Sequence, residues 1–284
     1  MSRGRRYAKN KKNYNIFIIG IILIILIGIS IIIINNKKKN GTAYIKENED
    51  IVETISKEKP IIELEEDEEI KELVENLIIQ KGLDTSNFSL FYYNVDSKKS
   101  YFYNEDTYFT GASTVKMPIA MLYSVGSEVP IKFLLEQSIV NSDNTAVNIL
   151  IENLGYTDCR KLIAQYSTIE LDENFYSTNI TNAKYAYDIV NHLYENIEDY
   201  SELLEYLKIS SNGQYLKKYI KDYDVAHKYG SYNGYVHDYG IVFGETTYLI
   251  GIFTKNIASA DEFIATTSLE IFNEVNANTK TQEE

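Results

Sequence analysis

The sequence predicts an α+β fold, in which one mixed sheet carries an inserted helical lobe and a membrane-spanning helix precedes the domain. Three observations support this prediction. Short aromatic runs typical of strands occur at residues 88–104, and strand-like runs recur at residues 225–254. Residues 113–220 between them have mostly helical periodicity, and residues 16–34 are apolar and uncharged. Strands at both ends with helices between them are typical of a single sheet with an inserted lobe.

Residues 16–34 predict a transmembrane helix. At a rise of 1.5 Å per residue, a run of this length spans a hydrocarbon core of about 30 Å. Basic residues are more numerous before the run than after it, which places the N-terminus in the cytoplasm and the body outside. A cleaved signal peptide is the alternative, but the run is long for one and no small-residue cleavage site follows it. We therefore expect a single-pass protein of the cell membrane.

Composition separates the remaining parts of the chain. Residues 1–15 form a basic tail, residues 35–66 a charged stalk, residues 67–276 the folded domain and residues 277–284 a polar tail. The formal net charge is −13, but residues 1–39 carry nine basic residues and no acidic one, so the rest of the chain is strongly acidic. An acidic body repels polyanions, which excludes nucleic acid as a partner. Cys159 is the single cysteine, so no internal disulfide forms.

The elements of the domain follow in order. The acidic cluster at residues 65–69 is expected to open a helix, because acidic residues in a first turn favour the helix dipole. Residues 88–96 and 99–104 predict a hairpin. Helical patterns follow at residues 131–139, 144–154, 158–166, 181–195, 200–208 and 212–220. The period then changes to that of strands at residues 225–231, 236–243 and 247–254, and residues 260–275 predict a closing helix.

Ser113 and Lys116 lie where a strand passage becomes a buried apolar helix. Residues three apart on a helix share a face, so Lys116 can reach the hydroxyl of Ser113. A serine hydroxyl becomes a nucleophile when an adjacent base takes its proton, and a lysine is such a base when burial or a second cation lowers its pKa. The same spacing occurs at Ser56 and Lys59, in a charged stretch with no apolar helix behind it, and is attributed there to chance.

Two further short motifs follow. Residues 142–144 read Ser-Asp-Asn in a turn between helices, and residues 228–231 read Lys-Tyr-Gly-Ser on the first late strand. Taken singly, each has a structural explanation as a helix cap, a solvated lysine or a β-bulge. Together with Ser-x-x-Lys, they resemble the motif set of class A β-lactamases and penicillin-binding proteins. Residues 144–150 and 237–242 are similar to that family as well, and the resemblance covers about residues 67–275.

The resemblance implies a β-lactamase/transpeptidase-like fold with a five-stranded antiparallel sheet, helices on its faces and an active site where the helical lobe meets the sheet. It implies an acyl-enzyme on Ser113, no metal and no organic cofactor. The implied partner is a β-lactam or a D-Ala-D-Ala stem peptide of peptidoglycan. The three histidines have no zinc-ligand spacing, which agrees with the expectation of no metal. The sequence leaves the oligomeric state open.

Each residue of the motifs receives a role. Ser113 attacks the carbonyl carbon, Lys116 accepts its proton, and Ser142 relays a proton to the leaving nitrogen, since a hydroxyl both donates and accepts. Lys228 raises the local positive potential and attracts a substrate carboxylate, and Asn144 binds the amide side chain of the substrate.

The remaining residues of the site lie on the late strand. Gly230 lets the backbone of that strand approach the ligand closely. The N–H groups of Ser113 and Ser231 form the oxyanion hole. Tyr229 departs from the family, which has a Thr or Ser there whose short hydroxyl binds the substrate carboxylate.

A second departure concerns the release of the acyl group. Class A β-lactamases carry a water-activating Glu in a Glu-x-x-Leu-Asn pattern, and the corresponding interval here is roughly a dozen residues short. Glu170 and Glu173 are the candidates, although neither matches the pattern fully and each can be a solvated loop acid. Without a placed base the acyl-enzyme clears slowly, which favours a penicillin-binding protein or a poor β-lactamase. The alternative is a non-hydrolytic sensor of β-lactams or wall fragments.

Overall fold

The computed structural model describes residues 64–125, 129–152 and 154–282. The basic tail, the predicted transmembrane helix at residues 16–34 and nearly all of the predicted stalk lie outside these residues. In the described part of the chain, no helix combines the length and the apolar character that a bilayer crossing requires.

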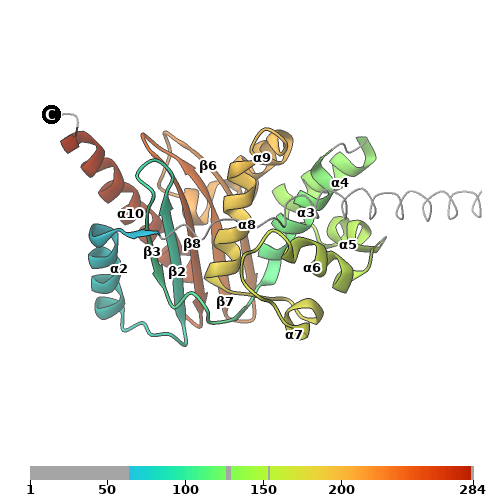
Figure 1. Ribbon diagram of the computed structural model, residues 1–284, viewed down its shortest axis with the longest axis horizontal. Helices are drawn as coiled ribbons and strands as arrows, with labels where there is room; N and C mark the ends of the chain where they lie inside the picture. Colours follow the sequence, from blue (N-terminus) through green and yellow to red (C-terminus); the bar gives the residue numbers. More distant parts are fainter. Residues whose placement is uncertain (1–63, 126–128, 153, 283–284) are drawn as a thin grey trace, which may run out of the picture. The chain divides into compact units, whose positions relative to one another are not determined.

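A six-stranded sheet forms the centre of the domain (Figure 1). Its strands, in spatial order, are β1 (Glu65–Glu66), β3 (Lys99–Tyr103), β2 (Phe88–Asn94), β8 (Thr247–Lys255), β7 (Tyr235–Phe243) and β6 (Asp224–Tyr232). Neighbouring strands are antiparallel except for β1, which pairs in parallel with β3. Strand β6 therefore forms one edge of the sheet, with one side of its backbone not covered by another strand of that sheet.

The expectation of a five-stranded antiparallel sheet is wrong by one parallel strand. Glu65 and Glu66, which were expected to begin a helix, are extended and pair with Lys99 and Ser100. The helix begins after Asp67, whose side chain accepts the N–H of Ile70 as an N-cap. The chain crosses over through that helix before it enters the β2–β3 hairpin, which allows a parallel pairing.

Helices cover both faces of the sheet (Figure 1). On one face, α2 (Glu68–Lys81) and α10 (Ala260–Gln282) join a core cluster with Leu90 and Tyr92 of β2. On the other face, Tyr187 of α8 (Ala183–Glu195) packs edge-on against Phe91 and Tyr93, with ring centroids 5.9 and 5.5 Å apart. Successive strand residues face opposite sides, so both layers bury β2 completely.

The helical lobe lies between the two groups of strands in the chain. Its helices are α3 (Lys116–Ser124), α4 (Val129–Val140), α5 (Asn144–Glu152), α6 (Tyr156–Ala164), α7 (Glu173–Ser177) and α9 (Ser201–Lys208). A two-stranded sheet of β4 (Phe109–Thr110) and β5 (Ile180–Thr181) and the 3₁₀ turn η1 (Ala112–Val115) connect the lobe to the main sheet.

Two predictions for the second half of the chain are wrong, namely a helix at residues 212–220 and the end of the closing helix at residue 275. The predicted helix at residues 212–220 is wrong, because η2 (Ser210–Gly213) and η3 (Tyr215–Lys217) are separate 3₁₀ turns. Positive φ angles at Ser211, Gly213 and Tyr215 interrupt any α-helix there. Helix α10 also continues to Gln282, past the predicted end at 275, since no glycine or proline stops it.

Candidate active site

The turn that carries Ser113 lies directly against strand β6. A Cβ atom at Gly230 would lie 2.7 Å from the backbone nitrogen of Ser113, 2.8 Å from that of Thr114 and 3.0 Å from the carbonyl oxygen of Gly111. Only a glycine allows this approach. The half-buried Ser113 is therefore held beside residues 228–231, although more than a hundred residues separate the two motifs in the chain.

Lys116 extends from the first turn of α3 to the Ser-Asp-Asn turn. Its side chain is 3% exposed, and its ammonium nitrogen donates to the Ser142 carbonyl at 2.5 Å, to Ser142 Oγ at 3.2 Å and to Asn144 Oδ1 at 2.7 Å. None of its hydrogen bonds in the described residues reaches Ser113 Oγ, so the contact that the helical spacing predicts is not formed in this state. Burial lowers the pKa of Lys116 to about 8, against the opposing effect of Asp143.

Lys228 approaches the same hydroxyl from strand β6. It is fully buried, and its nitrogen donates to Ser142 Oγ at 3.1 Å and to the Tyr229 carbonyl at 3.0 Å. Burial, followed by the repulsion of the Lys116 ammonium, lowers the pKa of Lys228 to about 7, while Asp238 acts in the opposite direction. Ser142 Oγ thus lies between two lysine nitrogens whose pKa values are both close to neutrality.

The Ser-Asp-Asn turn has a conformation that frees its first and third side chains. Ser142 has a φ of 52°, in the left-handed region that non-glycine residues rarely adopt. Asp143 caps α5, since its Oδ1 accepts the N–H of Ala146 at 2.9 Å. Its neighbours Ser142 and Asn144 do not form this cap. Helix capping therefore does not explain Ser142 and Asn144, whose polar atoms meet the lysines.

The Tyr229 side chain packs against another ring, whereas the short hydroxyl that the family has at this position is expected to bind the substrate carboxylate. Its ring stacks on that of Tyr215 in η3, with centroids 4.7 Å apart and planes at 16°, and the Lys228 nitrogen lies 4.3 Å from the ring centre. The half-buried ring thus packs beneath the lysine. Ser231 follows as an exposed residue of the edge strand.

Glu170 and Glu173 are exposed residues in the segment before β5. Glu173 begins α7, its side chain is 86% exposed, and its carboxylate lies 3.9 Å from Lys161 of α6. In the described residues neither carboxylate has a hydrogen bond or ion pair with Ser113, Lys116 or Ser142. The structure brings the three motifs together and leaves these two acids at the surface.

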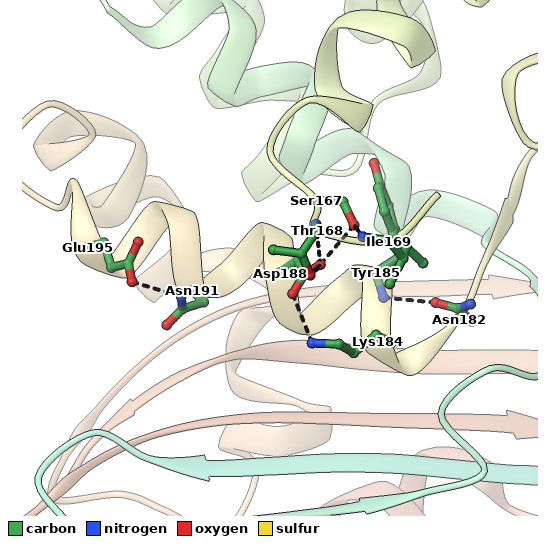
Figure 2. A network of polar contacts seen from close by, with 9 residues as sticks. All are labelled: Ser167, Thr168, Ile169, Asn182, Lys184, Tyr185, Asp188, Asn191 and Glu195. Atoms are coloured by element: carbon green, nitrogen blue, oxygen red, sulfur yellow. Dashed lines mark hydrogen bonds and ion pairs between the residues drawn. The ribbon is translucent and has the colours of Figure 1, made fainter. Parts of the chain in front are cut away.

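Buried polar residues attach this segment to the lobe. Figure 2 shows Asp188 of α8, which accepts hydrogen bonds from Ser167 Oγ at 2.8 Å and from the N–H and hydroxyl of Thr168 at 2.7 and 2.8 Å, and pairs with Lys184 at 3.2 Å. Asn179 connects the same segment to the turn that carries Ser113, donating from Nδ2 to the Ala112 carbonyl at 2.8 Å.

Sequence reasoning missed these anchoring residues. Asp188 had a signal, because it is an acid on the buried face of an amphipathic helix. Asn179 had none that distinguishes it from other loop asparagines. The described residues contain no cluster of His, Cys, Asp or Glu that could hold a metal ion.

Comparisons with known proteins give a family match. Residues 121–275 match the family described as the beta-lactamase enzyme family, a region that includes Ser142 and Lys228 but begins after Ser113. No curated protein matches the chain.

Several solved structures share the fold. A PBP-A mutant in an acyl-enzyme complex with penicillin G is 19% identical, with a TM-score of 0.60 and coverage of 73% of this chain and 96% of that one. A class A β-lactamase from Clostridium kluyveri is 18% identical (TM-score 0.60, coverage 74% and 100%). A β-lactamase from Chitinophaga pinensis is 16% identical (TM-score 0.61, coverage 72% and 99%). Identities this low establish the common fold alone.

Proposed function

Because the chain belongs to the β-lactamase enzyme family, we propose that it is a membrane-anchored serine hydrolase acylated on Ser113 by β-lactams or D-Ala-D-Ala-type peptidoglycan amides. The observation that carries the proposal is the position of Ser142 Oγ, 3.2 Å from the Lys116 nitrogen and 3.1 Å from the Lys228 nitrogen, beside the turn of Ser113. The anchor is residues 16–34, which place the domain outside the cell membrane.

Acylation proceeds through groups of this chain alone. Neutral Lys116 takes the proton of Ser113 as Oγ forms a bond to the substrate carbonyl carbon, and the N–H groups of Ser113 and Ser231 stabilise the oxyanion. The C–N bond then breaks, and Ser142 passes a proton to the leaving nitrogen while it recovers one from Lys116. Lys228 holds the substrate carboxylate by charge, and Asn144 binds the amide side chain.

Release of the acyl group is slow in this proposal. A water molecule needs a nearby base to attack the ester, and the candidate bases Glu170 and Glu173 are solvent-exposed side chains. The protein then behaves as a penicillin-binding protein, or as a poor β-lactamase.

Intact-protein mass spectrometry with benzylpenicillin tests this. We expect an adduct that maps to Ser113, persists for many minutes and is lost in Ser113→Ala. Ser56→Ala is the matched control, since Ser56 has the same spacing to a lysine and should leave the adduct intact. A transient adduct with accumulating ring-opened product would instead indicate an efficient β-lactamase. No adduct at any concentration would refute the acyl-enzyme.

A non-hydrolytic sensor is the second candidate, and the Tyr229 ring favours it. The ring occupies the strand position of the carboxylate-binding hydroxyl and stacks on Tyr215 instead. A sensor would bind radiolabelled penicillin reversibly in equilibrium dialysis, with equal affinity in the Ser113→Ala variant. Covalent label that survives denaturation would exclude it.

A further inference from the structure

Arg160 is a buried cation that has no part in the proposed acylation. It lies on α6, is 1% exposed, and donates from Nε to the Phe175 carbonyl at 3.2 Å and from Nη2 to the Ile180 carbonyl at 2.7 Å. Its guanidinium carbon lies 3.8 Å from the centre of the Phe175 ring. In the described part of the chain no carboxylate forms an ion pair with it.

A small hollow, with room for about one water-sized group, adjoins this guanidinium and is open in part to solvent. The nucleophile turn forms one side of it through Gly111 and Thr114. Residues 179–181 form another side. The lining is completed by Arg160, Tyr185 and Tyr239 and by the apolar residues Val115 and Pro118. The hollow therefore lies between α6, α8 and the turn that carries Ser113.

Tyr185 lines this hollow, and its hydroxyl has no hydrogen-bond partner in the described part of the chain. Tyr185 is 2% exposed, and in the described residues its oxygen is buried with no hydrogen bond. Its ring rises from α8 on the side away from the strands (Figure 2). Asn179 Oδ1 is likewise buried and unpartnered, whereas the Tyr239 hydroxyl donates to the Thr114 carbonyl at 3.4 Å. A buried charge without a counter-ion and a buried O–H without an acceptor both destabilise a fold.

We propose that the hollow binds a small monovalent anion of the halide type between the Arg160 guanidinium and the Tyr185 hydroxyl. Such an anion supplies the missing counter-charge and accepts the phenolic proton, so it satisfies both groups at once. Asn179 Oδ1 needs a donor, which one water beside the anion provides. The hollow has room for about one water-sized group, which a single halide fills, and the water lies at its open side. The bound anion then connects α6 and α8 to the nucleophile turn.

The test is the thermal midpoint of the full-length protein at fixed ionic strength, with sodium bromide or chloride replacing sodium gluconate. The midpoint should rise with halide concentration, because a ligand that binds only the native state stabilises it by mass action. In Tyr185→Phe the halide affinity should fall about tenfold, since a hydrogen bond to a charged group is lost. Arg160→Met should abolish the dependence.

Tyr156→Phe is the matched control. Tyr156 lies on α6, and its hydroxyl is also buried and unpartnered in the described residues, but it does not line the hollow. Its variant should keep the full halide response. Halide binding to the two active-site lysines would affect both phenylalanine variants equally, so the difference between them reports this hollow.

Crystals soaked in bromide supply a second measurement, which does not depend on Arg160→Met folding. Anomalous density in the hollow of the wild type, absent in Tyr185→Phe crystals, is the expected result. Equal midpoints in halide and gluconate, equal responses of the two phenylalanine variants, or water alone in the hollow would each overturn the proposal. None of these readouts depends on acylation of Ser113.

Discussion

Gly230→Ala is the substitution whose effect the structure specifies most directly. A Cβ atom at this position would lie within 3.0 Å of three backbone atoms of the nucleophile turn, two of them at 2.7 and 2.8 Å. Real Cβ contacts are longer than this, and backbone atoms cannot move aside as a flexible side chain can. Either β6 or the turn that carries Ser113 must therefore shift.

The size of the effect follows from this crowding. Overpacking by one methyl group costs about 1–3 kcal/mol when the surroundings are rigid. If the turn moves, Ser113 shifts relative to Lys116 and to its own oxyanion N–H, and a misplacement of about 1 Å costs roughly a hundredfold in rate. We expect the acylation rate constant to fall about 10–100-fold, with a modest decrease in the thermal midpoint.

The assay is quenched-flow mass spectrometry of the benzylpenicillin adduct, with the thermal midpoint measured alongside it. Gly244→Ala is the control, because Gly244 lacks a positive φ and its added Cβ would lie 3.2 Å from the Thr246 carbonyl in a turn remote from the motifs. It should keep the wild-type acylation rate. Wild-type acylation by a folded Gly230→Ala protein would refute the close approach of β6 to Ser113.

Four further predictions follow from the same geometry. The acylation rate should rise about tenfold per pH unit up to about pH 7, because only neutral Lys116 accepts a proton. It should level off between the Lys228 pKa of about 7 and the Lys116 pKa of about 8, and fall above pH 8, because Lys228 loses the charge that attracts the substrate carboxylate; a flat profile from about pH 5 to 7 would exclude Lys116 as the base. Tyr229→Thr should raise the rate with carboxylate-bearing β-lactams about tenfold, by adding one charge-assisted hydrogen bond, but not with their methyl esters. Glu173→Gln should leave the adduct lifetime unchanged within twofold, and a longer lifetime would show that this exposed acid reaches the acyl group. Asp188→Ala should reduce the free energy of unfolding by about 2–3 kcal/mol in urea titrations, because it removes the charged acceptor of the hydrogen bonds from Ser167 and Thr168, and an unchanged midpoint would contradict that anchoring role.

The residues that the sequence identified best are those whose chemistry is unusual for their setting. Lys116 in a buried apolar helix and Lys228 on a buried strand are each expensive to desolvate, so their presence there indicates a compensating partner. The sequence shows the order and spacing of the motifs that contain these lysines, and the resemblance to the family predicts that the motifs come together in one site. The lysine–serine contacts themselves required the fold, since 86 residues separate Lys228 from Ser142.

The sequence failed where the outcome depends on a distant partner. The two-residue strand β1 has no periodicity of its own and exists because β3 offers an edge. The turns η2 and η3 replace a predicted helix because backbone angles at Ser211 and Tyr215 are set by packing, and neither residue type requires a positive φ. The bonds of Arg160 to two loop carbonyls likewise follow from tertiary structure alone.

The direction in which the Ser142 O–H points determines whether this hydroxyl can donate a proton to the leaving nitrogen. A hydroxyl oxygen accepts two hydrogen bonds, and here the two lysine nitrogens lie at both acceptor positions. Once Lys116 has taken the proton of Ser113, both lysines are protonated donors, so the single O–H of Ser142 has no lysine to donate to and can point to the nitrogen of a bound amide. When Lys116 loses its proton to become the base for Ser113, Lys228 continues to hold Ser142 in place. Two lysines around one hydroxyl therefore separate proton acceptance from proton donation, which breaking a C–N bond requires.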